Sequence, residues 1–340
     1  MSRYLETLPV ELAENLVTFL TVQETGALRL TSRNMEDRVS QGSFRRRFHR
    51  ETLNLLVPDL QRLAQRTERL QISREVQHLI IWCSMNLDSE EEFWRDIDEI
   101  QRLLTVIFRN LKHHINTGVL RSLSFRANIT NFRALRQFWP ILQSVRRRAF
   151  EVTMKAIRDS RLSVGELDLS PKSTGCGLDY RDFLPLARDL NLARILRDSE
   201  QFTLSLMPST RGMHPPFRDP DARHQGESIA PILRALPDMM RHLESLDLHW
   251  VSITADTNVP DENTGYPQLD VRLDKARRST ARPRKCTLHG LYVYRSDLLR
   301  FVDEYRPTTL KMKRVRLVSG SKSSVLRSLQ RSGFAVDPHY

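Results

Sequence analysis

A run of basic residues in the last third of the chain has the composition of an anion-binding site. Residues 275–285 contain Lys275, Arg277, Arg278, Arg282, Arg284 and Lys285 around Pro283. Arg can hold a phosphate or carboxylate with paired N–H donors, whereas Lys offers a point charge. The run therefore predicts a binding site for an acidic or phosphorylated protein at Arg277, Arg278, Arg282 and Arg284. A solvated loop or a nuclear import signal would have the same composition.

Other polar clusters offer no catalytic or metal-binding arrangement. His113 and His114 are adjacent, so on a helix their side chains point about 100° apart and cannot hold one metal ion together. Asp96, Asp98 and Glu99 fall in a helical stretch rich in Arg, which is typical of a solvated helix face. The sequence contains no phosphate-binding glycine loop and no HExxH or GxSxG motif. We therefore expect a non-catalytic protein with no cofactor and no metal.

The charge of the chain is distributed unevenly. The 340 residues carry a net charge of +12. Residues 1–42 hold four Arg against six acidic residues, which leaves a net charge of −2, so the remainder carries +14. A field of this sign attracts acidic protein surfaces or nucleic acid.

Cysteine usage and hydropathy indicate the compartment. Cys83, Cys176 and Cys286 are far apart and form no CxxC pair, as expected of reduced thiols in a cytoplasmic or nuclear protein. No run approaches the roughly eighteen consecutive apolar residues of a membrane span, and the N-terminus lacks the pattern of a secretory signal. We expect a soluble protein that does not bind membranes.

A short apolar helical module opens the chain. Pro9, after Leu8, fixes the backbone for the first turn of a helix. The apolar residues that follow recur at spacings of three and four on both sides of a polar break: Leu12, Leu16, Phe19, Leu20, Leu28, Leu30 and Met35. A module of this size needs a partner or a following domain to cover its apolar face.

The segment resembles the F-box. Its Leu-Pro start, its Glu11-Leu12 pair and the sequence "LRLTSR" fall where that family has them, although Met35 replaces a common aromatic residue. The resemblance implies that the module docks on the Skp adaptor of a cullin-RING ubiquitin ligase. The residues implied to contact the adaptor are Leu8, Pro9, Leu12, Leu16, Leu20, Leu28 and Leu30. A plain helical hairpin that caps a larger domain is the alternative.

The rest of the chain repeats a short phrase of the form apolar-x-x-apolar-x-apolar, whose alternation predicts strands with one buried face. Its copies are "VQHLII" from Val76, "LRSLSF" from Leu120, "VGELDL" from Val164, "LESLDL" from Leu243, "LHGLYV" from Leu288 and "MKRVRL" from Met312, and "FTLSL" from Phe202 is a shortened copy. Helices are predicted between them at 91–113, 132–158, 180–197, 228–242 and 296–306. Stacked strand-helix units bury a continuous core only by packing on their neighbours, which favours an open curved solenoid.

These phrases resemble the leucine-rich repeat, with an irregular period near forty residues. Together with the N-terminal module, they resemble fungal F-box proteins. We therefore expect an α+β or α/β repeat protein with an F-box at 1–42, a bridging segment at 43–75 and an irregular leucine-rich-repeat-like substrate domain at 76–340. Another α/β topology is the alternative to the repeat.

Three segments rich in Pro, Gly and charge follow strand phrases, at 171–178, 208–226 and 256–283. In a strand-helix solenoid, loops that leave strand ends emerge on one rim, so we expect them to cluster as a substrate site. Insertions without a function would have the same composition.

The resemblance implies a non-catalytic substrate receptor of an SCF-type ubiquitin ligase, in the cytoplasm, the nucleus or both. Two alternatives remain: an F-box scaffold that works outside any ligase, and a basic nucleic-acid-binding repeat protein, which we regard as the weaker of the two.

Overall fold

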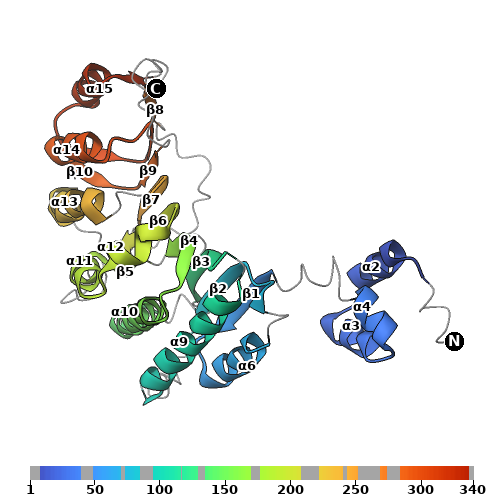
Figure 1. The fold of residues 1–340 in the computed structure, drawn as a ribbon. Coiled ribbons are helices and arrows are strands. Elements are labelled where there is room, and N and C mark those ends of the chain that lie inside the picture. The colour runs from blue at the N-terminus through green and yellow to red at the C-terminus, as the bar shows by residue number, and fades with distance from the viewer. Residues whose placement is uncertain are drawn as a thin grey trace.

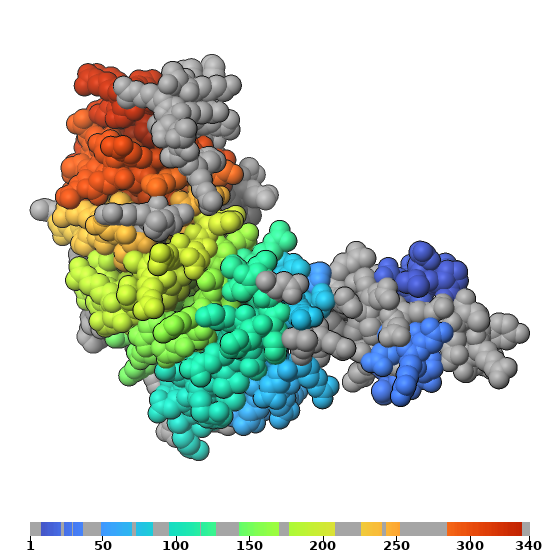
Figure 2. All heavy atoms as spheres, viewed as in Figure 1, coloured from blue at the N-terminus to red at the C-terminus, as the bar shows by residue number. Residues whose placement is uncertain are grey.

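The computed structural model describes residues 8–39, 49–69, 73–84, 95–115, 117–128, 135–169, 177–207, 222–239, 243–251, 269–273 and 284–336. It has two parts with separate hydrophobic cores, a small helical module and a large α/β domain (Figures 1 and 2). Among the described residues, no helix is long and apolar enough to cross a membrane.

The helical module consists of α2 (Val10–Phe19), α3 (Val22–Arg29) and α4 (Arg33–Val39). A capping box starts α3: the Thr21 hydroxyl accepts from the Glu24 N–H, and the Glu24 carboxylate accepts from the Thr21 N–H. Val17 and Met35 are buried against each other, and Leu28 packs on them. The predicted helical module is therefore present, with a small core of its own.

The large domain is built on an eleven-stranded sheet that does not close into a barrel. The strands are β1 (Arg50–Asn54), β2 (His78–Ser84), β3 (Val119–Asn128), β4 (Ser163–Leu169), β5 (Leu178–Asp179), β6 (Gln201–Met207), β7 (Ser245–Trp250), β8 (Leu269–Leu273), β9 (Lys285–His289), β11 (Thr309–Lys313) and β13 (Phe334–Val336). Their order is β1-β2-β3-β4-β6-β7-β9-β11-β8-β13, and β5 pairs with β6. Pairing is parallel from β1 to β11, and only β8 pairs antiparallel to its neighbours, β11 and β13.

The helices of the large domain lie along one side of this sheet (Figure 1). They are α6 (Val57–Thr67), α9 (Ile97–His114), α10 (Leu135–Ser160), α11 (Tyr180–Asp189), α12 (Leu192–Ile195), the 3-10 turn η2 (Leu196–Asp198), α13 (Ala222–Met239), α14 (Arg295–Tyr305) and α15 (Lys322–Arg331). The strand order explains this arrangement. Crossovers between parallel strands are nearly always right-handed, so a sheet whose strands follow sequence order places every crossover helix on the same face.

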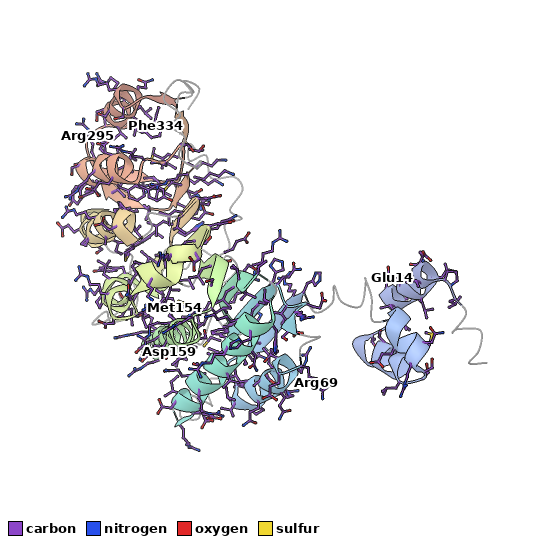
Figure 3. The ribbon with its side chains drawn as sticks, viewed as in Figure 1. Glu14, Arg69, Met154, Asp159, Arg295 and Phe334 are labelled. Carbon is purple, nitrogen blue, oxygen red and sulfur yellow. The ribbon has the colours of Figure 1, made fainter. Side chains whose placement is uncertain are left out.

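The core fills the space between helices and sheet, where Met154 of α10 is fully buried (Figure 3). Helix α9 falls within the helix predicted at 91–113, and its apolar stripe Ile100, Leu104, Ile107 and Leu111, spaced by three and four residues, is buried. In each parallel strand the apolar residues of the predicted phrase face this core, and the alternate residues face away from the helices.

The strand predictions are confirmed for β2, β3, β4, β6 and β7, and they are wrong in detail for the last two phrases. "LHGLYV" is divided between β9 and β10 (Tyr292–Tyr294), and "MKRVRL" is divided between β11 and β12 (Arg316–Ser319). Positive φ angles at Gly290 (73°) and Arg314 (54°) break the strands, and β10 pairs with β12 in a second, two-stranded sheet. A side chain at position 290 would come within 2.7 Å of the Trp250 carbonyl oxygen, so glycine is required there.

Several elements were not predicted. Strand β1 and helix α6 lie in the predicted bridge, and they pack on β2 and α9 as part of the large domain. Residues 269–273, predicted as part of a loop, form β8 because β11 and β13 pair with them from distant parts of the chain.

Two cysteines are buried in the core and yield the first testable prediction. Burial raises the pKa of the Cys83 thiol to about 12, against the lowering effect of Arg146. Burial and the Asp247 charge also raise the pKa of the Cys286 thiol well above its ordinary value. Because only about 10⁻⁴ of such a thiol is ionised near pH 8, both should react with Ellman's reagent at least about a hundredfold more slowly in the native protein than after denaturation.

Cys176 lies outside the described residues, so the Cys176→Ser variant isolates the two buried thiols. Two thiols should then be titrated in guanidinium chloride and almost none in native buffer. Rapid labelling of the native variant would contradict the burial of Cys83 and Cys286.

Candidate functional sites

Helix α2 presents apolar side chains on two faces. Ala13 and Val17 are buried inside the helical module. Leu12 and Phe19, seven residues apart and so on one line of the helix, are 52% and 82% exposed, with the half-buried Leu16 between them. A helix with an apolar face outside its own core is suited to packing against another protein.

The predicted adaptor-binding residues differ in their solvent exposure. Leu12, Leu30 (89% exposed) and Pro9 are exposed, Leu8, Leu16 and Leu20 are half-buried, and Leu28 packs inward on Val17 and Met35. Phe19 is the residue that the predicted set omits. The sequence shows its helical spacing to Leu12 and Leu16. The packing of α4 on α2, however, determines which apolar residues of α2 are exposed to solvent.

The face of the sheet opposite the helices, here called the open face, carries polar rows defined by the strand register. Its middle row runs through Ile80, Ser124, Asp168, Thr203, Asp247, Thr287 and Lys311. Beside this row, Arg126 lies 5.9 Å from the Trp82 ring centroid at one end, and the His249 and His289 rings lie 5.3 Å apart toward the other. The acidic residues lie in the centre of the row, and Lys311 lies at its end. Such a surface can form hydrogen bonds and ion pairs with a polar protein segment.

Most of the predicted loop cluster, at 171–178, 208–226 and 256–283, lies outside the described residues, so its clustering stays a prediction. Leu169, Met207 and Trp250 end neighbouring parallel strands at the same edge of the sheet. The basic run does not start from this edge. Because β8 is antiparallel, the connection from Leu273 to Arg284 joins the opposite edge, where β9 begins. The expectation that residues 256–283 form one loop on one rim is therefore wrong.

Of the four predicted substrate-binding arginines, Arg284 alone lies among the described residues. Arg277, Arg278 and Arg282 lie outside the described residues. Arg284 is half-buried, donates through Nη1 to the Tyr305 carbonyl oxygen at 2.9 Å and lies 5.7 Å from the Tyr305 ring centroid. Its guanidinium therefore ties the start of β9 to the end of α14, whereas substrate binding by the four residues stays a prediction.

The other polar candidates have structural partners. His114 is half-buried, and its Nδ1 lies 2.6 Å from the Ser73 hydroxyl. Glu99 accepts two bonds from Arg102, both 2.6 Å long, which lowers the pKa of Glu99. Among the described residues, no group of three His, Cys, Asp or Glu side chains could hold a metal ion.

Three consecutive arginines of α10 differ in their surroundings, and Arg146 is buried. Arg147 pairs with Asp182 at 3.3 Å, and Arg148 pairs with Glu151 at 3.4 Å.

Comparison with known proteins adds no assignment. No protein-family model matches the chain, and no curated protein matches it significantly. Its function therefore has to be argued from its own residues and geometry.

The contact between Arg284 and Tyr305 generates the second prediction. Arg284→Glu should lower the free energy of unfolding by about 1–2 kcal/mol, because it removes a charge-assisted hydrogen bond to a half-buried carbonyl. Arg278→Glu makes the same change of charge in the same run and should change the free energy of unfolding by less than about 0.5 kcal/mol. Urea titration of both variants provides the measurement. Equal stabilities would show that Arg284 has no structural role.

Proposed function

We propose that this protein is the substrate receptor of an SCF-type cullin-RING ubiquitin ligase, with an F-box at its N-terminus and a leucine-rich-repeat-like solenoid behind it. The observation that carries the proposal is the outward apolar line of α2. Leu12 and Phe19 are exposed while the module already has a core of its own, so the line has no intramolecular use among the described residues.

The large domain supports the same proposal. Its parallel strands follow sequence order and its helices lie on one side, which is the arrangement expected of a leucine-rich-repeat-like solenoid. Such a frame holds a bound protein in a fixed position. In the F-box family that the sequence resembles, the adaptor and cullin bring this protein close to the ubiquitin-charged enzyme, so the receptor works by positioning rather than by catalysis.

The third prediction tests the apolar line. The double variant Leu12→Asp, Phe19→Asp should weaken binding of an Skp-type adaptor by at least about a hundredfold, because burial of each side chain contributes about 1.5–3 kcal/mol. The readout is co-purification from cells that express both proteins, followed by titration calorimetry.

The matched control is Asn15→Asp, Thr18→Asp, which adds the same charge to exposed positions of the same helix. It should bind the adaptor nearly as the unmodified protein does, and circular dichroism should show equal helix content in both variants. Retention of the adaptor by the Leu12, Phe19 variant would remove the F-box assignment. Adaptor binding without capture of a cullin would instead favour the ligase-independent scaffold.

A further inference from the structure

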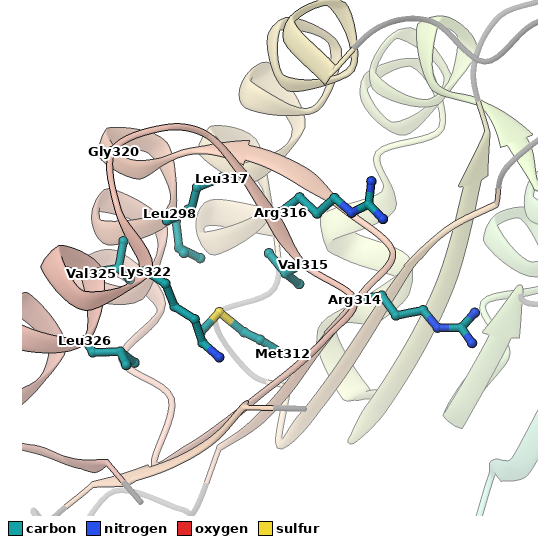
Figure 4. Close-up of a pocket in the computed structure, with 10 residues that line it drawn as sticks. All are labelled: Leu298, Met312, Arg314, Val315, Arg316, Leu317, Gly320, Lys322, Val325 and Leu326. Carbon is teal, nitrogen blue, oxygen red and sulfur yellow. The ribbon is translucent and has the colours of Figure 1, made fainter. Parts of the chain in front are cut away.

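The last strand-helix unit contains a cavity of about 330 Å³ between α14, the segment from β11 to β12, and α15. The apolar residues of its lining are Leu298, Met312, Val315, Leu317, Val325 and Leu326 (Figure 4). Ligand pockets usually measure about 300–1,000 Å³, so this one is suited to one or two aliphatic side chains rather than to a large cofactor.

Three basic residues, Arg314, Arg316 and Lys322, take part in the lining of this cavity. In Figure 4 the side chains of Arg314 and Arg316 extend from the β11–β12 segment away from the apolar residues of the cavity, and Lys322 lies among those residues. Arg316 donates to the Tyr292 hydroxyl at 2.9 Å and lies 5.6 Å from that ring centroid, so its charge is held in place.

The charge extends well beyond the cavity. Residues 305–336 contain eight Lys or Arg and not one Asp or Glu, whereas α14 carries Asp297, Asp303 and Glu304 beside Arg295 and Arg300. The unit as a whole is therefore positive, and a partner in the cavity would lie in a field that favours acidic groups. The cavity also includes the first turn of α15, whose backbone dipole favours an anion at that end.

From this geometry we infer that the last unit binds an acidic peptide segment through one aliphatic anchor residue. The anchor enters the cavity, and flanking carboxylates meet Arg314, Arg316 and Lys322. Nucleic acid fits less well, because the lining offers no aromatic ring on which a base could stack. That the segment belongs to a ubiquitylation substrate rests on the proposed function, whereas the binding itself does not.

The fourth prediction uses fluorescein-labelled peptides of defined sequence, measured by fluorescence anisotropy on the full chain, alone or with its co-purified adaptor. The first peptide has three Glu, one Leu and three Glu, and the second has Ala in place of Leu. The Leu peptide should bind about tenfold more tightly, and both should weaken as salt is raised. Equal affinities would overturn the anchor, and they would leave adaptor docking through α2 untouched.

Two variants distinguish the contribution of the cavity to peptide binding from the contribution of the charge. Val315→Trp fills the cavity at a half-buried position and should make the two peptides bind equally while the charge attraction remains. Lys322→Glu should weaken both peptides about fivefold, and the matched control Arg331→Glu, at an exposed position of the same helix outside the cavity, should weaken them less than about twofold.

Three further results would overturn the inference. One is an equal effect of the Lys322 and Arg331 variants, which would indicate net charge alone. Another is unchanged discrimination between the peptides in Val315→Trp. The third is tighter binding of a twelve-residue oligothymidylate than of the Leu peptide at the same salt, which would identify the surface as a nucleic-acid site.

Discussion

Parallel pairing of each long strand with the next one along the chain is the constraint on which the large domain depends. From β1 to β11 every crossover helix falls on one face, so that face alone needs an apolar lining. Leu123, Leu167 and Phe202 occupy one register row beneath the helices, and Ser124, Asp168 and Thr203 occupy the next row on the open face. The same backbone arrangement thus supplies a continuous core on one face and a mostly polar row on the other.

A sheet built this way has an edge strand at each end, and the strand pairing differs between the two ends. At the C-terminal end, β8 and β13 extend the sheet beyond β11 with antiparallel pairing. The last strand of the order, β13, has only three residues, and very short edge strands help keep a sheet from pairing with other chains. The addition takes residues 269–273 out of a long connection and sends the basic run to the opposite edge from the other loops. This long-range pairing therefore decides at which edge of the sheet the chain leaves β8.

We connect two apolar surfaces with binding, and neither is covered by the packing of the core beside it. The outward line of α2 remains after Val17 and Met35 complete the small core. The cavity beside α15 remains where the chain leaves β11 at Arg314 and forms β12 instead of a closer-packed turn. They belong to separate cores, so one can be altered without disturbing the other. This separation suits a protein that holds one partner at its N-terminus and another at its far end.

Sequence alone determined the local periodicities: the helices of the N-terminal module, the stripe of α9 and five of the long strands, because apolar spacing reports which face is buried. It also located the exposed apolar residues of α2 to within one turn. Sequence could not show that α2 leaves Leu12 and Phe19 outside, that Arg284 bonds to Tyr305, or that residues 269–273 pair with β11. Each of these depends on a segment distant in the chain. So does the division of the strand phrase "LHGLYV", where Gly290 donates its N–H to the Lys313 carbonyl oxygen and has no room for a side chain beside the Trp250 carbonyl oxygen. Local apolar patterns determine which residues are buried, whereas long-range pairing determines which other segment of the chain covers them.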